Sequence, residues 1–452
     1  MIGRLTAGTT AIVACLMTVA CSQAPSGEAT GAPSRVTTDT SETSIAGGLV
    51  TTRRSTTVEE RTAASAPLED IDSQQAIQPQ SGLLTAGDHD DLLNPRGYAR
   101  YASGFLQSAG RDLPFVDTRT RHVVRVLGAG GRPVPFADVT VSRKGDALRL
   151  TTTADGTASY YPTFDRIGDQ ATVTVRTGAQ KASRTADGRE TVITMPGQAP
   201  SVGALDVAIV LDTTGSMGDE IEFLRAEIVS IVQRVKRDAG NVDVRIGLIA
   251  YRDEGDAYVV KPLGMTNDAG AMRRLIGGLD ADGGGDTPEA MDQALQAATR
   301  LQWRPDAAKA VLLVADAPPH DDDIAAAMTA AQTLRSRGVQ IVPVAASGVD
   351  DTAQYVMRTM AALTQGRYVF LTDDSGVGDA HAEPDVACYA VTRLNGLIAR
   401  ILTGIAQGRR IEPADSEIVR IVGGYDRGRC TDEGRTNGNQ RRGAPDRDDA
   451  DH

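Results

Sequence analysis

Residues 205–217 read LDVAIVLDTTGSM, and this stretch decides the fold of the chain. Its first part, Asp206 to Asp212, is a short run rich in Val and Ile, which is typical of a strand buried on both faces of a parallel sheet. A polar loop follows, and the sequence from Asp219 to Lys236 then has the apolar spacing of an amphipathic helix. We therefore predict a βα unit here, with the loop at the carboxyl end of its strand.

The same alternation continues to about Gly408. Further strands are expected at Val242–Tyr251, Ala310–Ala315, Val339–Ala345 and Tyr368–Leu371, and further helices at Ala269–Leu279, Pro288–Leu301, Asp322–Arg335 and Thr352–Leu363. This pattern predicts an α/β domain over residues 203–410, with a Rossmann-like, doubly wound and mostly parallel sheet covered by helices on both faces. Ligands of such sheets bind at the carboxyl ends of the strands.

The loop after the first strand has oxygen donors at alternate positions. Asp212, Thr214 and Ser216 bring one carboxylate and two hydroxyls to the same point, just before a helix. Hard oxygen ligands with few carboxylates suit Mg²⁺, which keeps several of its waters. The loop is therefore a candidate cation site.

The loop Asp212-Thr213-Thr214-Gly215-Ser216 resembles the Asp-x-Ser/Thr-x-Ser motif of von Willebrand factor type A domains. Two later segments, residues 283–290 and 311–319, fit the same resemblance. It implies a metal-ion-dependent adhesion site that holds one divalent cation, preferably Mg²⁺, with Ca²⁺ or Mn²⁺ as alternatives. It also implies binding of a protein partner and no catalysis.

The second segment reads GGGDTPEA and departs from the family pattern, which has a threonine ligand here. Gly285 takes the place of that threonine, so Asp286 is the nearest oxygen donor and Thr287 the second choice. The alternative is a helix start, with Asp286 or Thr287 as N-cap, Pro288 in the first turn and Glu289 as a favourable early acid. Both interpretations can hold together, because a cap uses only one oxygen lone pair.

The third segment places Asp316 directly after the apolar run Val311–Ala315. An acid at the end of a buried strand is costly unless it is paired or bound to metal, and the family has its last metal-site aspartate here, often coordinating through water. The alternative for Asp316 is a turn or N-cap residue. His320 follows after two prolines and is expected to be an exposed loop residue, not a ligand. The predicted ligand set is thus Asp212, Thr214, Ser216, Asp286 and Asp316, with the two hydroxyls direct and at least one aspartate acting through water.

Two other functions compete with the binding module. The same loop also resembles the Asp-Lys-Thr-Gly-Thr phosphorylation loop of P-type ATPases, but Thr213 replaces the lysine, so a metal-dependent phosphohydrolase is the enzyme alternative. The second alternative is an envelope assembly scaffold that does not need the metal. Nucleic acid is not an expected partner, because the net charge is −12 and aromatic residues make up only 4% of the chain.

Residues 121–197 change to a period of two, which predicts a small β-sandwich. Strands are expected at His122–Leu127, Ala137–Ser142, Leu148–Thr153, Ala171–Arg176 and Thr191–Met195, with a hairpin turn at Asp155-Gly156. The segments 131–141 and 153–156 resemble carboxypeptidase regulatory-like or transthyretin-like domains, which are usually spacers or binding modules. Residues 83–120 are expected to be a connecting segment, in which residues 88–91, DHDD, form a solvated, helix-capping acidic loop or, less well supported, a calcium loop.

The N-terminus has the features of an export signal. A charged start, Met1 to Arg4, precedes an apolar run to Ala20, and residues 18–21, TVAC, resemble the bacterial lipobox. We expect residues 1–21 to be the signal and Cys21 to carry lipid, although Cys15 also follows a lipobox-like stretch and an ordinary cleaved signal is the alternative. Residues 22–82 are rich in Ser, Thr, Ala and Gly and predict a disordered tether with a span of roughly 40 Å. The chain is thus expected in the cell envelope, bound to a membrane through lipid.

Two cysteines remain far downstream, Cys388 and Cys430. In an oxidising compartment we expect them to form a disulfide; the alternative is two free thiols. The last part of the chain, residues 411–452, is expected to be a largely disordered extension.

Overall fold

The computed structural model describes residues 84–110, 112–168, 170–285, 287–376 and 384–431, and the statements below refer to these residues. The predicted signal, the lipidation site Cys21 and the tether lie outside them. A nine-stranded sheet forms the centre of the α/β domain, with the order β11-β10-β9-β12-β13-β14-β1-β15-β16.

Five neighbouring strands of this sheet are parallel, and each lies where the sequence predicts a strand. They are β9 (Ala204–Asp212), β10 (Asp243–Tyr251), β12 (Ala308–Ala315), β13 (Val339–Ala345) and β14 (Tyr368–Thr372). The sequence did not predict β11 (Val260–Thr266), which pairs antiparallel with β10 at one edge. Strand β9 is apolar on both faces, with Leu211 in one core and Val210 in the other. The predicted mostly parallel sheet is confirmed.

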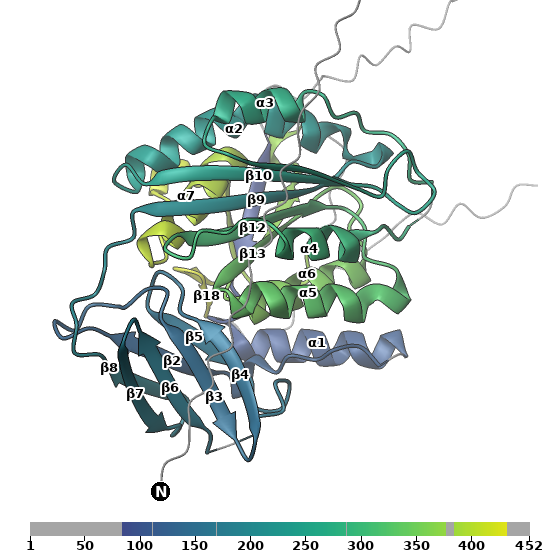
Figure 1. Ribbon diagram of the computed structural model, residues 1–452. Coiled ribbons are helices and arrows are strands. Elements are labelled where there is room, and N and C mark those ends of the chain that lie inside the picture. Colours follow the sequence, from purple (N-terminus) through teal and green to yellow (C-terminus); the bar gives the residue numbers. More distant parts are fainter. Residues whose placement is uncertain (1–83, 111, 169, 286, 377–383, 432–452) are drawn as a thin grey trace, which may run out of the picture. The chain divides into compact units, whose positions relative to one another are not determined.

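Helices cover both faces of the sheet (Figure 1). One apolar core holds side chains of α2 (Gly218–Asp238), α3 (Ala269–Ile276) and α7 (Leu394–Gln407). The opposite core holds side chains of α1 (Pro95–Ala109), α4 (Met291–Thr299), α5 (Ile324–Ser336) and α6 (Asp351–Leu363). Short 3₁₀ turns lie at Thr118–Thr120, Gly215–Met217, Asp321–Asp323, Asp373–Ser375 and Asp415–Glu417. None of the helices in the described residues is long and apolar enough to cross a membrane.

The segment expected to be a connection supplies a strand of the α/β domain. Strand β1 (Thr85–His89) lies inside the sheet and pairs antiparallel with both β14 and β15 (Tyr389–Arg393). Helix α1 follows it, and its Tyr98 hydroxyl lies 2.9 Å from the Thr359 hydroxyl of α6. The α/β domain is therefore built from two stretches of chain, and the β-sandwich is inserted between them.

The acidic run at residues 88–91 is neither a solvated loop nor a calcium loop, since its carboxylates are held by arginines. Asp88 is 4% exposed and lies 3.4 Å from Arg367 and 3.2 Å from Arg410. Asp91 is 3% exposed and lies 2.7 Å from Arg358, which is itself buried. Buried charges require such partners, and the arginines come from sequence positions far from the run.

The expectation of a largely disordered extension is wrong for residues 411–431. Strand β16 (Arg420–Val422) extends the sheet beside β15, and β17 (Tyr425–Asp426) and β18 (Arg429–Cys430) form a small hairpin. The structure joins Cys388 and Cys430 by a disulfide with a Cα–Cα distance of 5.4 Å, as the sequence led us to expect. The Asn94 side chain also donates to Gly428 O at 2.8 Å and accepts from Cys430 N at 2.8 Å. These bonds fix the extension on the loop between β1 and α1.

The sandwich consists of a three-stranded and a four-stranded sheet around one apolar core. The first has the order β5-β2-β8, with β5 Thr157–Tyr160, β2 His122–Leu127 and β8 Glu190–Thr194. The second has the order β4-β3-β6-β7, with β4 Asp146–Thr151, β3 Asp138–Arg143, β6 Thr172–Thr177 and β7 Gln180–Thr185. Strands β5 and β7 were not predicted.

The sandwich is bonded to the α/β domain. Arg335 of α5 lies 2.8 Å from Asp165, and the Tyr161 hydroxyl donates to Ala362 O at 2.6 Å. Thr151 adds a hydroxyl bond to Ser336 O at 3.0 Å. Since Asp165 and Arg335 are both buried, this contact is a fixed interface.

Candidate metal centre

The predicted first and third segments meet at the carboxyl edge of the sheet. Strands β9 and β12 are neighbours, so Asp212 at the end of β9 and Asp316 directly after β12 lie close together. Asp212 is fully buried and Thr214 is 2% exposed, whereas Ser216 is exposed. The structure thus brings Asp212, Thr214, Ser216 and Asp316 to one place.

The two carboxylate oxygens of Asp212 differ in their hydrogen bonding. Its Oδ1 accepts from the backbone N of Thr214 at 3.0 Å and from the Thr214 hydroxyl at 2.8 Å. Its Oδ2 is buried and has no hydrogen-bond partner of good geometry among the described residues, although the nearby Tyr251 hydroxyl lowers the pKa of Asp212. Burial, and next the charge of Asp316, raise the pKa of Asp212 to about 7. The Asp212 carboxylate is therefore held in place but poorly compensated.

Asp316 lies near Asp212, and its carboxylate is also largely buried. It is 9% exposed, and burial raises its pKa, while a hydrogen bond with Ser216 acts in the opposite direction. The Ser216 hydroxyl therefore connects the first loop to the end of β12.

The glycine segment lies directly against the first loop. Gly215 N donates to Gly283 O at 3.1 Å, and Asp282 N donates to Thr213 O at 3.2 Å. A Cβ at Gly284 would lie 3.2 Å from the Thr214 Cβ and 3.0 Å from the Glu289 Oε1, and φ is 69° there, so this position favours glycine. Asp286 lies outside the described residues, and Thr287 is exposed.

Glu289 belongs to the site, which corrects its expected role as an early helical acid. Helix α4 begins only at Met291, with Ala290 as its N-cap. Glu289 N donates to Pro318 O at 3.0 Å, so the segment bonds to the loop after β12 before the helix starts. The side chain is 3% exposed, and its Oε2 has no hydrogen-bond partner. Burial and the charge of Asp212 raise the pKa of Glu289 to about 8.

Glu220 is a second acid that the sequence analysis missed. It lies in the first turn of α2, where an acid is ordinarily a favourable exposed residue. Here it is 3% exposed, its Oε1 accepts from Ser347 N at 3.4 Å, and its Oε2 has no partner. Burial is the main reason that its pKa rises to about 7. The available signal was its spacing, because Leu224 follows four residues later on the buried face of the helix.

Two more carboxylates border the glycine segment. Asp256 Oδ2 accepts from Gly284 N at 3.0 Å and from Asp253 N at 3.1 Å. Asp253 lies 2.7 Å from His320 Nε2, and this bond raises the pKa of His320. His320 is therefore half-buried and ion-paired, not the simple exposed loop residue that the sequence suggested.

The donor set fits a hard divalent cation. Three buried carboxylate oxygens, one each from Asp212, Glu220 and Glu289, have no donor, and two hydroxyls lie in the same loop. The charges that act most strongly on Glu289 after burial are those of other acids, which a cation would offset. No group of three His, Cys, Asp or Glu in the described ranges is arranged to hold a metal by itself. Among the described residues, the hydroxyls of Thr214 and Ser216 are the further oxygen donors in this loop.

Comparison with known proteins agrees with this architecture. A family model described as von Willebrand factor A domain matches residues 206–380. The chain is 31% identical over 185 residues to a putative ariadne-like RING finger protein of Acanthamoeba polyphaga mimivirus, covering 37% of this chain and 18% of that protein. It is 27% identical over 117 residues to the alpha-protein kinase vwkA of Dictyostelium discoideum, covering 26% of this chain and 19% of the kinase. The chain thus spans about a fifth of the length of the curated relatives that it matches.

A solved von Willebrand factor type A structure from Catenulispora acidiphila is similar at 16% identity and a TM-score of 0.29, covering 64% of this chain and 48% of that one. The family match begins at Asp206 in β9, so it includes the strands that carry Asp212 and Asp316. Residues 206–380 of this chain are a von Willebrand factor A domain.

Proposed function

We propose that this protein is exported and tethered to a membrane, and that its von Willebrand factor A domain binds a protein partner with the help of one divalent cation. Domains of this family are generally protein-interaction or adhesion modules. The observation that carries the metal is Asp212 Oδ2, a buried carboxylate oxygen that has no hydrogen bond of good geometry to any described residue. A buried charge of this kind is costly unless a cation or donor compensates it.

The residues of the first loop would hold the ion. We assign direct ligation to the hydroxyls of Thr214 and Ser216, with Asp212, Asp316 and Asp286 as the carboxylates and at least one of them acting through water. Thr287 is the weaker choice in the second segment, since Asp286 is nearer in sequence to the position of the family threonine. A bound Mg²⁺ would supply positive charge and coordination positions for oxygen ligands. Ca²⁺ and Mn²⁺ accept similar oxygen donors.

The two acids found only in the structure influence how the partner would be bound. Glu220 and Glu289 add carboxylates around a site that already has Asp212 and Asp316. This negative charge reduces the attraction of the ion for a carboxylate of a partner. We therefore favour a role in which the ion holds the first loop and the glycine segment in one arrangement, and these loops contact the partner.

The enzyme alternative is weaker, because Thr213 already has a structural role. Its hydroxyl donates to Tyr251 O at 2.8 Å, and the residue is fully buried. The phosphorylation loops that it resembles have a lysine at this position, which Thr213 replaces. The scaffold that needs no metal is also weaker, since it would leave three buried carboxylate oxygens without a compensating charge.

A pull-down from detergent-solubilised membranes tests the proposal. The mature protein should retain a partner in Mg²⁺ and release it when the metal is removed, and Asp212→Ala should retain none. Asp322→Ala is the matched control, because Asp322 is an exposed acid six positions after Asp316. Unchanged Mg²⁺ affinity of Asp212→Ala in calorimetry would falsify the site assignment. Metal-dependent hydrolysis of a phosphoester by the parent protein would favour the enzyme.

A further inference from the structure

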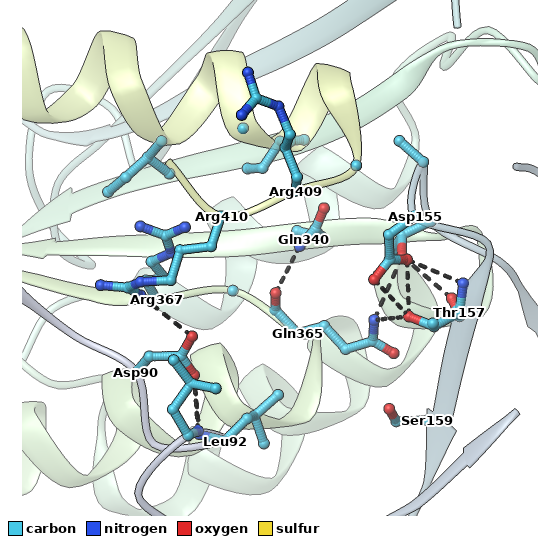
Figure 2. A pocket seen from close by; sticks show the side chains of 18 of the residues that line it. Asp90, Leu92, Asp155, Thr157, Ser159, Gln340, Gln365, Arg367, Arg409 and Arg410 are labelled. Carbon is cyan, nitrogen blue, oxygen red and sulfur yellow. Dashed lines mark hydrogen bonds and ion pairs between the residues drawn. The ribbon is translucent and has the colours of Figure 1, made fainter. Parts of the chain in front are cut away.

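A cavity of about 250 Å³ lies where the β-sandwich meets the amino ends of the parallel strands. The sandwich contributes the Asp155 turn and β5, and the α/β domain contributes Gln340 of β13, the Gln365–Arg367 segment and the end of α7 (Figure 2). The candidate metal centre is at the carboxyl ends of the same strands. The cavity is therefore a separate site.

One wall of the cavity is a fixed set of amides and hydroxyls. Gln365 Nε2 donates to the Thr157 hydroxyl at 3.1 Å, and Gln340 Nε2 donates to Gln365 O at 2.5 Å. Asp155 accepts from Thr157 N at 2.9 Å, so its charge is engaged within its own turn. Figure 2 shows Gln340 and Gln365 between the Asp155 side of the cavity and the Arg367 side.

The lining as a whole is basic. The lining includes five arginines and two carboxylates: Arg121, Arg125, Arg367, Arg409 and Arg410 against Asp90 and Asp155. Some of this charge is already compensated, since Arg125 lies 2.7 Å from Glu190, and Arg410 binds Asp88, Asp90 and Glu412.

Two of the arginines have guanidinium N–H groups without a hydrogen-bond partner among the described residues. Arg367 is nearly buried, yet its guanidinium makes one long contact, 3.4 Å to Asp88 Oδ2. Arg121 is half-buried, and its side chain has neither an ion pair nor a hydrogen bond to a described residue. Burial and the nearby charge of Arg410 lower the pKa of Arg367, in agreement with a surplus of positive charge.

We propose that this cavity binds a small hydroxylated organic anion, with its carboxylate or phosphate against Arg121 and Arg367 and its hydroxyls against Gln340, Gln365 and Thr157. Guanidinium groups are suited to both kinds of anion, because their N–H donors match two oxygens at once. Apolar residues such as Val342 and Ile405 complete the lining and suit the carbon skeleton of the ligand. A bound ligand would contact the sandwich and the α/β domain together.

Calorimetry with three hexose probes tests the anion requirement. Glucuronate carries a carboxylate, glucose 6-phosphate carries a phosphate, and glucose has neither. The titrations use the Asp212→Ala protein at constant ionic strength, so that coordination to a metal cannot contribute and a failure of the proposed metal site does not affect the result. We expect glucuronate or glucose 6-phosphate to bind and glucose not to bind, and the tighter of the two identifies the acid group. Binding of neither anion, or equal binding of glucose, overturns the proposal.

Substitutions then locate the site. Arg121→Gln should weaken anion binding at least tenfold, and because the side chain of this arginine has no partner among the described residues, the fold should be unaffected. Arg149→Gln is the matched control, as an exposed arginine of β4 outside the cavity, and should leave affinity unchanged. Arg367→Gln provides a second measurement from the other domain and should also weaken binding. Equal weakening by Arg149→Gln would show general attraction to a basic surface and overturn the site.

Discussion

Asp212, Glu220 and Glu289 are carboxylates that the fold keeps from water without supplying enough donors. Each is buried for a different local reason. Asp212 ends a buried strand, Glu220 lies on the buried face of a helix, and Glu289 lies in a segment that is hydrogen-bonded to a neighbouring loop. Their common property is a raised pKa with burial as the largest cause. In the metal-free protein these groups therefore retain protons near neutral pH.

We expect the thermal stability of the metal-free protein to fall as the pH rises from about 6 to about 8.5. The folded pKa values of Asp212 and Glu289 are about 7 and about 8, whereas the ordinary values are 3.8 and 4.5. Between these limits the folded state binds more protons than the unfolded state, so raising the pH removes stability. Melting temperatures of dialysed, metal-free protein across this range measure the effect.

Magnesium should reverse that trend. A cation replaces the protons, so Mg²⁺ should release protons on binding, bind more tightly at the higher pH and restore the melting temperature. The Asp212→Asn, Glu289→Gln double variant should show a flatter pH profile and little response to Mg²⁺. A metal-free parent whose melting temperature rises over this range would contradict the assignment.

The residues of the candidate site could be predicted only in part from sequence. The sequence pointed to four residues at the ends of two apolar strands: Asp212, Thr214, Ser216 and Asp316. In both places the apolar run and the oxygen donors are adjacent in the chain, so the pattern can be recognised locally. Glu289 was assigned to a helix start because the Pro-Glu pair is typical of one. Its actual position depends on the backbone hydrogen bond from Glu289 N to Pro318 O, and Pro318 is distant in sequence.

At the scale of elements, β1 shows a similar limit. Its sequence, TAGDH, has a single β-branched residue, Thr85, and none of the large apolar residues that favour strands. Pairing with β14 and β15 on its two sides determines its conformation. Gly87 fits because the Phe370 and Tyr389 rings occupy the space of a side chain, and a Cβ would lie 2.7 Å from Phe370. The parallel strands, by contrast, carry their own apolar signal and were predicted correctly.

A buried ion pair lies directly after β1 and connects this segment to α6. Asp91 and Arg358 are both almost fully buried and make two hydrogen bonds, at 2.7 and 3.1 Å. Asp91→Asn should lower the free energy of unfolding by about 3–5 kcal/mol, because it leaves a buried guanidinium without its counter-charge. Urea denaturation followed by circular dichroism measures this change.

An exposed pair provides the control. Glu222 and Arg225 on α2 are 3.4 Å apart, with about half of each side chain exposed. Glu222→Gln should change stability by no more than about 0.5 kcal/mol. A similarly small effect of Asp91→Asn would mean that the buried pair does not hold β1 in the sheet.

At the scale of the whole molecule, the disulfide connects two segments that would otherwise be far apart in the chain. Cys388 and Cys430 are separated by 42 residues, and β16 lies between them. The Cys388→Ser, Cys430→Ser double variant should lose about 2–4 kcal/mol of stability, because the unfolded chain is no longer constrained. Urea denaturation gives the difference, and intact mass after alkylation gives the thiol count. Two alkylatable thiols in the oxidised parent would show that the bond does not form.

The membrane tether makes a separate prediction. Cys21 lies outside the described residues, and its lipidation rests on the lipobox-like residues 18–21. Cys21→Ala should move the protein from the membrane fraction to the soluble fraction, whereas Cys15→Ala should not, since Cys15 would leave with the signal. Retention of Cys21→Ala after a high-salt wash would contradict a lipid anchor.

The position of β1 also has a mechanical consequence. Thr85 lies opposite Thr372, at the end of β14 and thus at the same edge of the sheet as Asp212. Tension between the chain before residue 84 and a partner at this edge would run across the strands, so the hydrogen bonds of β1 to β14 and β15 would be loaded in turn, starting at Thr85. The sandwich follows β1 in the chain and lies outside this path. Force between an anchored N-terminus and a partner at the metal edge would therefore pass through the nine-stranded sheet and leave the sandwich unloaded.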